Sequence, residues 1–196
     1  DDRRILIANL AKGKIGGDSA SLLGAMLVAL FEQSAFSRAE LPEADRVPHT
    51  LIVDEFHNFA TTRFASAFSE LRKYGLSIVA CTQYLQQTLP EIRDSVFGNC
   101  GTIIALRTGA DDADLLRRQM GDEDKALWWY KDLPNYEAVV RRMTRIEDPW
   151  KIRLLPTIAQ PSHNGSSLKK RSQEKYATRR DVVEGKIQKW LGQGGG

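Results

Sequence analysis

The chain has 196 residues, of which 42% are hydrophobic and 27% carry a charge. This length is enough for one sizeable hydrophobic core, and the composition is typical of a soluble globular protein. No apolar run approaches the roughly 20 residues that a membrane-spanning helix needs. The two cysteines, Cys81 and Cys100, each end an apolar segment, so we expect buried reduced thiols and a cytoplasmic location.

Charge is distributed unevenly along the chain. Residues 151–196 hold ten Lys and Arg against three acids, a net charge of +7, whereas residues 1–150 carry −4. A basic tail on an acidic body favours an anionic partner. The alternative is a charged helix that faces solvent, which is the commoner situation.

The first predicted strand is Arg4–Leu10, a short apolar run bounded by charge. A glycine-rich turn follows, but its Gly-Lys pair precedes Ile15 instead of the Ser or Thr that a Walker A phosphate loop requires. We therefore expect a connection between strand and helix, with Asp18 or Ser19 as the N-cap. The helix over 19–36 is apolar on almost every side, which predicts that it is largely buried.

The next strand, Leu51–Val53, ends at two adjacent carboxylates, Asp54 and Glu55. A continuous apolar run of this kind predicts a central parallel strand with helices on both faces. Open α/β sheets bind their ligands at the carboxyl ends of such strands. In nucleotide-hydrolysing sheets, one acid lies beside Mg²⁺ and the next activates the attacking water. The alternative is that both acids only cap the following helix.

Strands and helices then alternate up to residue 120. A helix over 61–74 stops at Gly75, and the strand Leu76–Cys81 leads directly to Thr82 and Gln83. A helix over 89–96, a strand over 102–106 and a helix over 111–120 follow. This βαβα order predicts a parallel sheet covered by helices.

The pattern changes after residue 135. Residues 136–143 and 151–155 are typical of an antiparallel pair joined around Asp148-Pro149, and residues 160–167 have the composition of a linker. Residues 167–191 carry apolar side chains at helical spacing between basic ones, which predicts one amphipathic basic helix. The cluster at Trp128–Tyr130 is expected to pack in the core instead of stacking on nucleic-acid bases.

Several strings together resemble the FtsK/HerA superfamily of ring-shaped DNA-pumping ATPases, and in particular the coupling proteins of conjugation and type IV secretion (TraG/TraD-like). The strings span most of residues 4–155: ILIANLAKGKIG, LIVDEFHNF, SELRKYGLSIVACTQYLQQ, FGNCGTIIALRTGADDADLL and LPNYEAVVR. The resemblance implies a RecA-like α/β fold, ATP and Mg²⁺ as cofactors, and assembly as a homo-oligomer, expected to be a hexamer.

The resemblance also implies roles for individual residues. Asp54 would be the acid on the metal side and Glu55 the general base of a Walker B element, while Gln83 would orient the water against the γ-phosphate. Arg72 would be an arginine finger that reaches the nucleotide of a neighbouring subunit; otherwise it is a cation favoured by the helix dipole. Arg107 is either a second phosphate contact or a surface charge.

The family's Walker A loop would precede the first strand seen here, so we expect the chain to be the C-terminal portion of a RecA-like domain. We predict this portion at 1–155, a linker at 156–166 and the basic tail helix at 167–196. Without a phosphate loop, these 196 residues should hydrolyse no ATP alone. An anchor of the parent protein at the inner face of the cytoplasmic membrane would lie outside the sequence.

The function that follows is ATP-driven translocation of DNA, or of a DNA–protein substrate, through contacts to the phosphate backbone that do not read base sequence. Relaxase and secretion-channel proteins are the further partners that the resemblance implies. Two alternatives stay open. One is a secretion-assembly ATPase that does not bind DNA, and the other is a non-catalytic module that binds a partner protein through residues 167–191.

Overall fold

The computed structural model describes residues 4–143, 149–156 and 164–193. Two compact units make up the chain, Asp1–Leu154 and Leu155–Gly196. The junction residue Asp148 and most of the predicted linker lie outside the described residues. The domain boundaries that we expected from the sequence therefore stay predictions.

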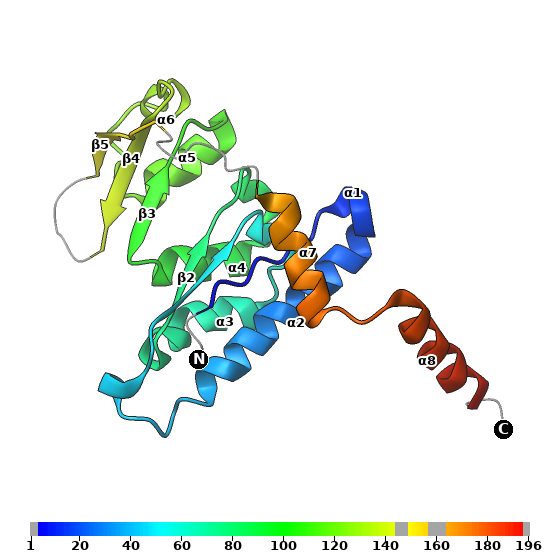
Figure 1. The fold of residues 1–196 in the computed structure, drawn as a ribbon. Coiled ribbons are helices and arrows are strands. Elements are labelled where there is room, and N and C mark those ends of the chain that lie inside the picture. Colours follow the sequence, from blue (N-terminus) through cyan, green and yellow to red (C-terminus); the bar gives the residue numbers. More distant parts are fainter. Residues whose placement is uncertain (1–3, 144–148, 157–163, 194–196) are drawn as a thin grey trace. The chain divides into compact units, whose positions relative to one another are not determined.

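A parallel pair of strands forms the first sheet (Figure 1). β1, His49–Val53, pairs with β2, Leu76–Ala80, from His49 opposite Leu76 to Val53 opposite Ala80. The connection between them contains helix α3, Thr62–Glu70, and the 3-10 helix η3, Leu71–Tyr74. This is the strand–helix–strand order that the sequence predicted around the two carboxylates.

Helices cover only one face of this sheet. Leu51, Val53 and Ile78 on that face pack with residues of α2 (Gly17–Phe36), α3 and α4 (Pro90–Asn99). On the other face Ile52 is 68% exposed and Val79 is 45% exposed. The prediction that both faces are covered was therefore wrong for the described residues, because a strand alternates its side chains and helices pack here on one side.

The segment Arg4–Leu10, which we predicted to be a strand, has no regular secondary structure. Ile5 is 91% exposed and Ile7 is 85% exposed. A strand is stable only when its backbone N–H and C=O groups pair with a neighbour, and this segment pairs with no strand among the described residues. The apolar pattern identified a segment suited to a sheet but could not predict whether a neighbouring strand is there to pair with it.

Helix α2 forms as predicted but begins differently. The short helix α1, Lys12–Ile15, precedes it, and Gly16 is its N-cap with a φ of +83°, so neither Asp18 nor Ser19 has that role. Glycine adopts this left-handed backbone without the steric cost of a side chain. The predicted cap was wrong because the helix starts two residues earlier than predicted, at Gly17.

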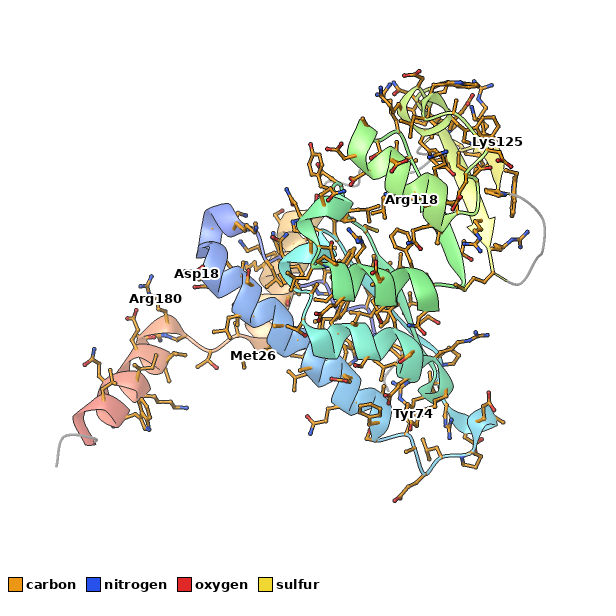
Figure 2. All side chains as sticks on the ribbon, turned by 180° about the vertical axis from the view of Figure 1, so that it is seen from behind. Asp18, Met26, Tyr74, Arg118, Lys125 and Arg180 are labelled. Atoms are coloured by element: carbon orange, nitrogen blue, oxygen red, sulfur yellow. The ribbon has the colours of Figure 1, made fainter. Side chains whose placement is uncertain are left out.

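The prediction that α2 is buried was also wrong. Leu22, Met26 and Leu30 are each more than half exposed, although Ala20, Gly24, Glu32 and Ala35 are buried. Figure 2 shows Met26 midway along this helix. By length and composition alone α2 could cross a membrane, which is weak evidence, since core helices of soluble proteins meet the same criterion. Here it packs against α3 through its small and aromatic residues.

A second sheet contains three antiparallel strands in the order β3-β4-β5. These are Thr102–Ala105, Glu137–Arg142 and Trp150–Arg153, and the last two form the predicted antiparallel pair. β3 pairs with β4 and not with β2, so the single parallel sheet expected from the strand–helix rhythm is wrong at this strand. The fold class, a mixed α/β arrangement, is confirmed.

The second sheet packs against α5, Ala110–Gln119, and α6, Trp128–Lys131. Tyr130 is fully buried, and its hydroxyl donates to Asp122 at 3.2 Å. Trp129 packs against the same core, and the Lys151 ammonium lies 4.1 Å from the centre of its ring. The predicted packing cluster is thus confirmed for two of its three residues, whereas Trp128 is 57% exposed.

The tail forms two helices instead of the single predicted one. α7 is Gly165–Tyr176 and α8 is Arg180–Gln193, and every side chain described in them is exposed. The break contains the β-branched Thr178, which has a low helix propensity. Asp181 lies in the first turn of α8, where a negative charge favours a new helix start.

Candidate active site

The candidate site lies where β1 and β2 end. Beyond the last strand pair, the Cys81 N–H donates to the Val53 carbonyl and the Phe56 N–H donates to the Cys81 carbonyl, both at 2.9 Å. Phe56 is 2% exposed and packs in the core under the sheet. These contacts fix the turn Asp54-Glu55 above a buried anchor, so the two carboxylates project from a rigid base.

Glu55 has a left-handed backbone, with φ 48° and ψ 50°. This conformation is unfavourable for a residue with a side chain, and it commonly costs about 1–3 kcal/mol. The turn is held in place by the Asp54 carboxylate, which accepts from the Glu55 N–H at 3.1 Å, and by Asn58, whose amide donates to the Glu55 carbonyl at 3.1 Å. Backbone strain of this kind concentrates at functional sites.

Two groups, one following each strand, contact the Glu55 carboxylate. The Gln83 backbone N–H donates to its Oε2 at 3.4 Å, and Nδ1 of His57 lies 3.5 Å from the same oxygen. His57 Nδ1 is also 3.2 Å from the Thr82 hydroxyl. The structure therefore brings together Asp54, Glu55 and Gln83, three of the five residues that the sequence nominated for the site.

These residues line one end of a cleft of about 1590 Å³. The remainder of the cleft runs along β1, between the 4–12 segment and α2, and its walls are largely apolar, with Leu6, Val28 and Phe31 among them. Polar side chains gather at the end with the carboxylates. This end of the cleft therefore offers groups that could position a water molecule or a phosphate.

The electrostatics of this end are acidic. Burial raises the pKa of the Cys81 thiol, and the neighbouring charges of Asp54 and Glu55 raise it further. Cys81 is exposed and Cys100 is half-buried, and both are free. The expectation of two buried thiols was therefore wrong for Cys81, because it lies at the strand end where the chain leaves the core.

Hard carboxylate oxygens are the ligands that Mg²⁺ prefers, and it is usually held by one or two carboxylates together with phosphates and waters. Asp54 is exposed beside Glu55 and suits this role. The described residues contain no cluster of three or more acidic, His or Cys side chains that would hold an ion by themselves. The residues present thus fit a metal that arrives with a phosphate ligand.

Arg72 lies away from this end. It belongs to η3, which precedes β2, so it lies at the opposite edge of the sheet. Figure 2 labels Tyr74, the last residue of this turn. Arg46 donates to the carbonyls of Leu41 and Lys73, and Arg38 donates to those of Val47 and Tyr74. The Arg72 side chain is exposed and, within the described residues, has no hydrogen-bond or ion-pair partner.

Arg107 also lies outside the cleft. It follows β3 and donates from its guanidinium to the Asn135 side chain at 3.2 Å. The sequence placed Arg107 near the phosphates because it follows a strand, but that strand belongs to the second sheet. Its role as a phosphate contact stays a prediction.

Sequence reasoning gave little weight to three residues that the structure connects to the site. His57 lies in a single 3-10 turn, Phe56–Asn58, that brings its ring back to Glu55. Lys12 donates from its ammonium to Asn58. Asp112 is buried on α5 and accepts from the Leu85 N–H at 3.0 Å, which fixes the loop after Gln83. No local sequence signal links residues this far apart.

The fold is that of a RecA-like α/β protein. The plasmid coupling protein TrwB, in complex with the GTP analogue GDPNP, superposes with a TM-score of 0.55 and 20% identity, over 74% of this chain and 38% of TrwB. VirB4 of Thermoanaerobacter pseudethanolicus superposes with a TM-score of 0.56 and 14% identity, over 75% of this chain and 40% of VirB4. The genome packaging NTPase B204 of Sulfolobus turreted icosahedral virus 2, in complex with AMPPCP, superposes with a TM-score of 0.51 and 16% identity. The superposition covers 68% of this chain and 63% of B204.

Residues 48–127 match the family model TraG-D_C, described as the TraM recognition site of TraD and TraG. This stretch contains both carboxylates, Arg72, Gln83 and Arg107. The resemblance to TraG/TraD-like proteins is thereby confirmed over this stretch. No curated protein matches the chain. The chain spans less than two thirds of the length of the solved structures to which it is similar.

Proposed function

We propose that the chain is part of an ATP-hydrolysing motor of the coupling-protein kind, which drives DNA or a DNA–protein substrate in conjugation or type IV secretion. The observation that carries this proposal is Glu55, a carboxylate in a strained left-handed turn at the carboxyl end of a parallel strand. Three of the similar structures are of proteins that their descriptions call coupling protein or NTPase, with nucleotide analogues bound.

Each residue of the site would have its own role in ATP hydrolysis. Glu55 would accept the proton of the attacking water, and the Gln83 N–H and His57 hold its carboxylate in place. The exposed Gln83 side chain would orient that water. Asp54 would hold Mg²⁺, which when bound neutralises charge on the phosphates. The phosphate-binding loop would come from a part of the protein that the 196 residues do not contain.

Arg72 would complete the site of a neighbouring subunit. A finger supplied in trans stabilises charge that develops in the transition state of phosphoryl transfer. Its exposed position at the edge opposite Glu55 suits contact with a second copy and excludes contact with Glu55 of the same chain. A closed ring, which we expect to be a hexamer, repeats this contact at every interface.

DNA would be held through its phosphates. Within residues 164–193, each of the three acids pairs with a nearby cation, as Arg180 does with Glu184 at 2.6 Å. Five further cations on α7 and α8 have no acidic partner there: Lys169, Arg171, Lys175, Lys186 and Lys189. This surplus of exposed positive charge supports binding to a polyanion without base readout.

A protein partner is proposed as well. The description of the matched model, a TraM recognition site, is a statement about TraD and TraG. We propose that the surface of residues 48–127 recognises a protein of the DNA-processing complex, such as a relaxase-associated factor, or the secretion channel. Pull-down of such a partner by residues 1–196, lost when surface positions in 48–127 are changed, would test this part separately from hydrolysis.

The experiment that tests the enzyme uses the full-length protein with its phosphate loop. Glu55→Gln should bind ATP as the wild type does and lose hydrolysis by about 10²–10⁴-fold, because the amide cannot accept a proton. Glu43→Gln is the matched control, since Glu43 is an exposed glutamate on η1, Glu43–Asp45, outside the cleft. Hydrolysis by Glu55→Gln at the control rate would contradict the proposed function.

A further inference from the structure

We propose that His57 is a positioning residue for Glu55, and that its neutral ring carries its proton on Nδ1. The ring lies beside the carboxylate because Glu55 turns the chain left-handed and the following 3-10 turn, Phe56–Asn58, returns it. His57 Nδ1 is 3.5 Å from Glu55 Oε2 and 3.2 Å from Thr82 Oγ1. The side chains of His57 and Glu55 are 15% and 30% exposed, so solvent competes little with these contacts.

The position of the proton follows from the partners of Nδ1. The Thr82 hydroxyl has a single proton, which it donates to the Tyr84 carbonyl at 3.3 Å. Its oxygen can then only accept from His57. An ionised carboxylate is likewise an acceptor only. Both neighbours of Nδ1 therefore require an N–H at that atom, and Nε2 is left as the unprotonated nitrogen.

This contact links the two strands that form the site. Glu55 follows β1, and Thr82 and Gln83 follow β2. His57, hydrogen-bonded to Thr82 and 3.5 Å from the Glu55 carboxylate, therefore positions that carboxylate relative to the Gln83 loop. Asp112 fixes the same loop from the other side through Leu85. His57 acts through Glu55 and not on substrate, and it acts as a hydrogen-bond donor. An amide side chain, which also donates, can replace it in this role.

The inference rests on the proposed function for its effect on rate but not for its geometry. The first test is therefore nuclear magnetic resonance of residues 1–196, with ¹⁵N in the imidazole rings, at about pH 8.5, well above the ordinary histidine pKa of about 6.5. His57 should show the Nδ1–H tautomer. His49, whose ring stacks on Phe31, has no hydrogen bond to its ring within the described residues and serves as the internal reference for the ordinary Nε2–H form.

Thr82→Val removes the hydroxyl at nearly constant volume and should move His57 toward the Nε2–H tautomer. Thr50→Val is its matched control, because Thr50 is an exposed threonine on β1 away from His57. An Nε2–H tautomer for His57 in the wild-type chain, or a Thr82→Val spectrum equal to the control, would overturn the assignment of the donor.

The second test is hydrolysis by the full-length protein. His57→Ala should lower kcat by about 10²-fold, as misplaced catalytic groups do, with KM for ATP unchanged. His57→Gln should stay near the wild-type rate because its amide still donates, and His49→Gln should leave the rate unchanged. A wild-type rate in His57→Ala, or a loss in His57→Gln as large as in His57→Ala, would overturn the role. If Glu55→Gln also hydrolyses ATP normally, the proposed function itself has failed, and the tautomer result separates the two cases.

Discussion

The two edges of the β1–β2 sheet differ in chemistry. At the carboxyl edge, Glu55 accepts from Gln83 and lies beside His57, and the acids Asp54 and Glu55 lie near the Lys12 ammonium, which donates to Asn58. At the amino edge, Arg38 and Arg46 donate to backbone carbonyls of η3, the turn to which the exposed Arg72 belongs. The strands are five residues long, so about 17 Å separates the edges at about 3.3 Å per residue.

This separation has a direct consequence for mechanism. One chain cannot place Arg72 on the phosphate attacked by the water that its own Glu55 would activate, because an arginine side chain is much shorter than the sheet. If both residues serve hydrolysis, then each active site combines the carboxyl edge of one subunit with the amino edge of another. The alternative is that the amino edge is structural, with Arg72 a cation that favours the end of its helix.

The largest expected effect is on the rate of the full-length protein. Arg72→Ala should lower kcat by about 10³–10⁵-fold, the usual consequence of losing an arginine finger. Arg118→Ala is the control, since Arg118 is an exposed arginine on α5 (Figure 2) that pairs only with Asp114 among the described residues. Steady-state ATPase assays at saturating ATP measure both, and equal rates would show that the amino edge is not catalytic.

Deleting residues 167–196 should weaken DNA binding and leave both edges intact. Each phosphate that the shortened protein no longer neutralises reduces the slope of log affinity against log salt by about 0.9, so the decrease in affinity should grow as salt is lowered. A lesser deletion of residues 194–196 is the control. Affinity measured by fluorescence anisotropy at several salt concentrations tests this. An unchanged slope would mean that the tail does not bind DNA.

Two glycine substitutions should perturb one edge each. A Cβ at Gly24 would lie 2.1 Å from the Phe59 ring next to the carboxyl edge, so Gly24→Ala should lower the free energy of unfolding by about 1–3 kcal/mol. Gly75 at the amino edge has a φ of +79°, and Gly75→Ala should cost about 1 kcal/mol.

Urea denaturation of residues 1–196 measures both effects. Gly98 in α4 is the control: a Cβ there meets no atom within 4 Å, and alanine favours a helix interior, so Gly98→Ala should be neutral or stabilising by up to about 1 kcal/mol. Equal unfolding free energies for all three variants would contradict the packing at both edges.

The smallest effect concerns the Cys81 thiol. Burial, Asp54 and Glu55 raise its pKa, and a thiolate is the reactive form. Asp54→Asn removes one negative charge, so the pKa should fall and alkylation at mildly alkaline pH should become faster. The measurement uses a Cys100→Ser background, with Asp45→Asn on η1 as the control. An unchanged alkylation rate would show that the charge of Asp54 does not raise the pKa of Cys81.

Local patterns predicted the elements of this fold well but not their partners. The strand before Asp54 and the stop at Gly75 could be predicted because each depends on a few adjacent residues. Which face of α2 is exposed, and whether β3 joins β2 or β4, depend on contacts between residues far apart in the sequence. Periodicity identifies an apolar face without identifying what covers it.

The candidate site was predictable to the same extent. Asp54, Glu55 and Gln83 meet because the ends of two parallel neighbours lie at one sheet edge, a rule that needs only the order of strands. His57 was missed as a contact of Glu55 because it depends on the left-handed turn at Glu55, and no propensity predicts that backbone for a glutamate. Arg107 follows a strand as well, but of another sheet.

The measurement that tests the composite site most directly mixes two inactive variants of the full-length protein, Glu55→Gln and Arg72→Ala. In mixed rings, some interfaces pair the intact Glu55 of one chain with the intact Arg72 of the other. ATPase activity should therefore return above the sum of the separate preparations. If subunit exchange is demonstrated by labelled chains and no activity returns, the two edges do not form one composite site, and the proposed mechanism is contradicted.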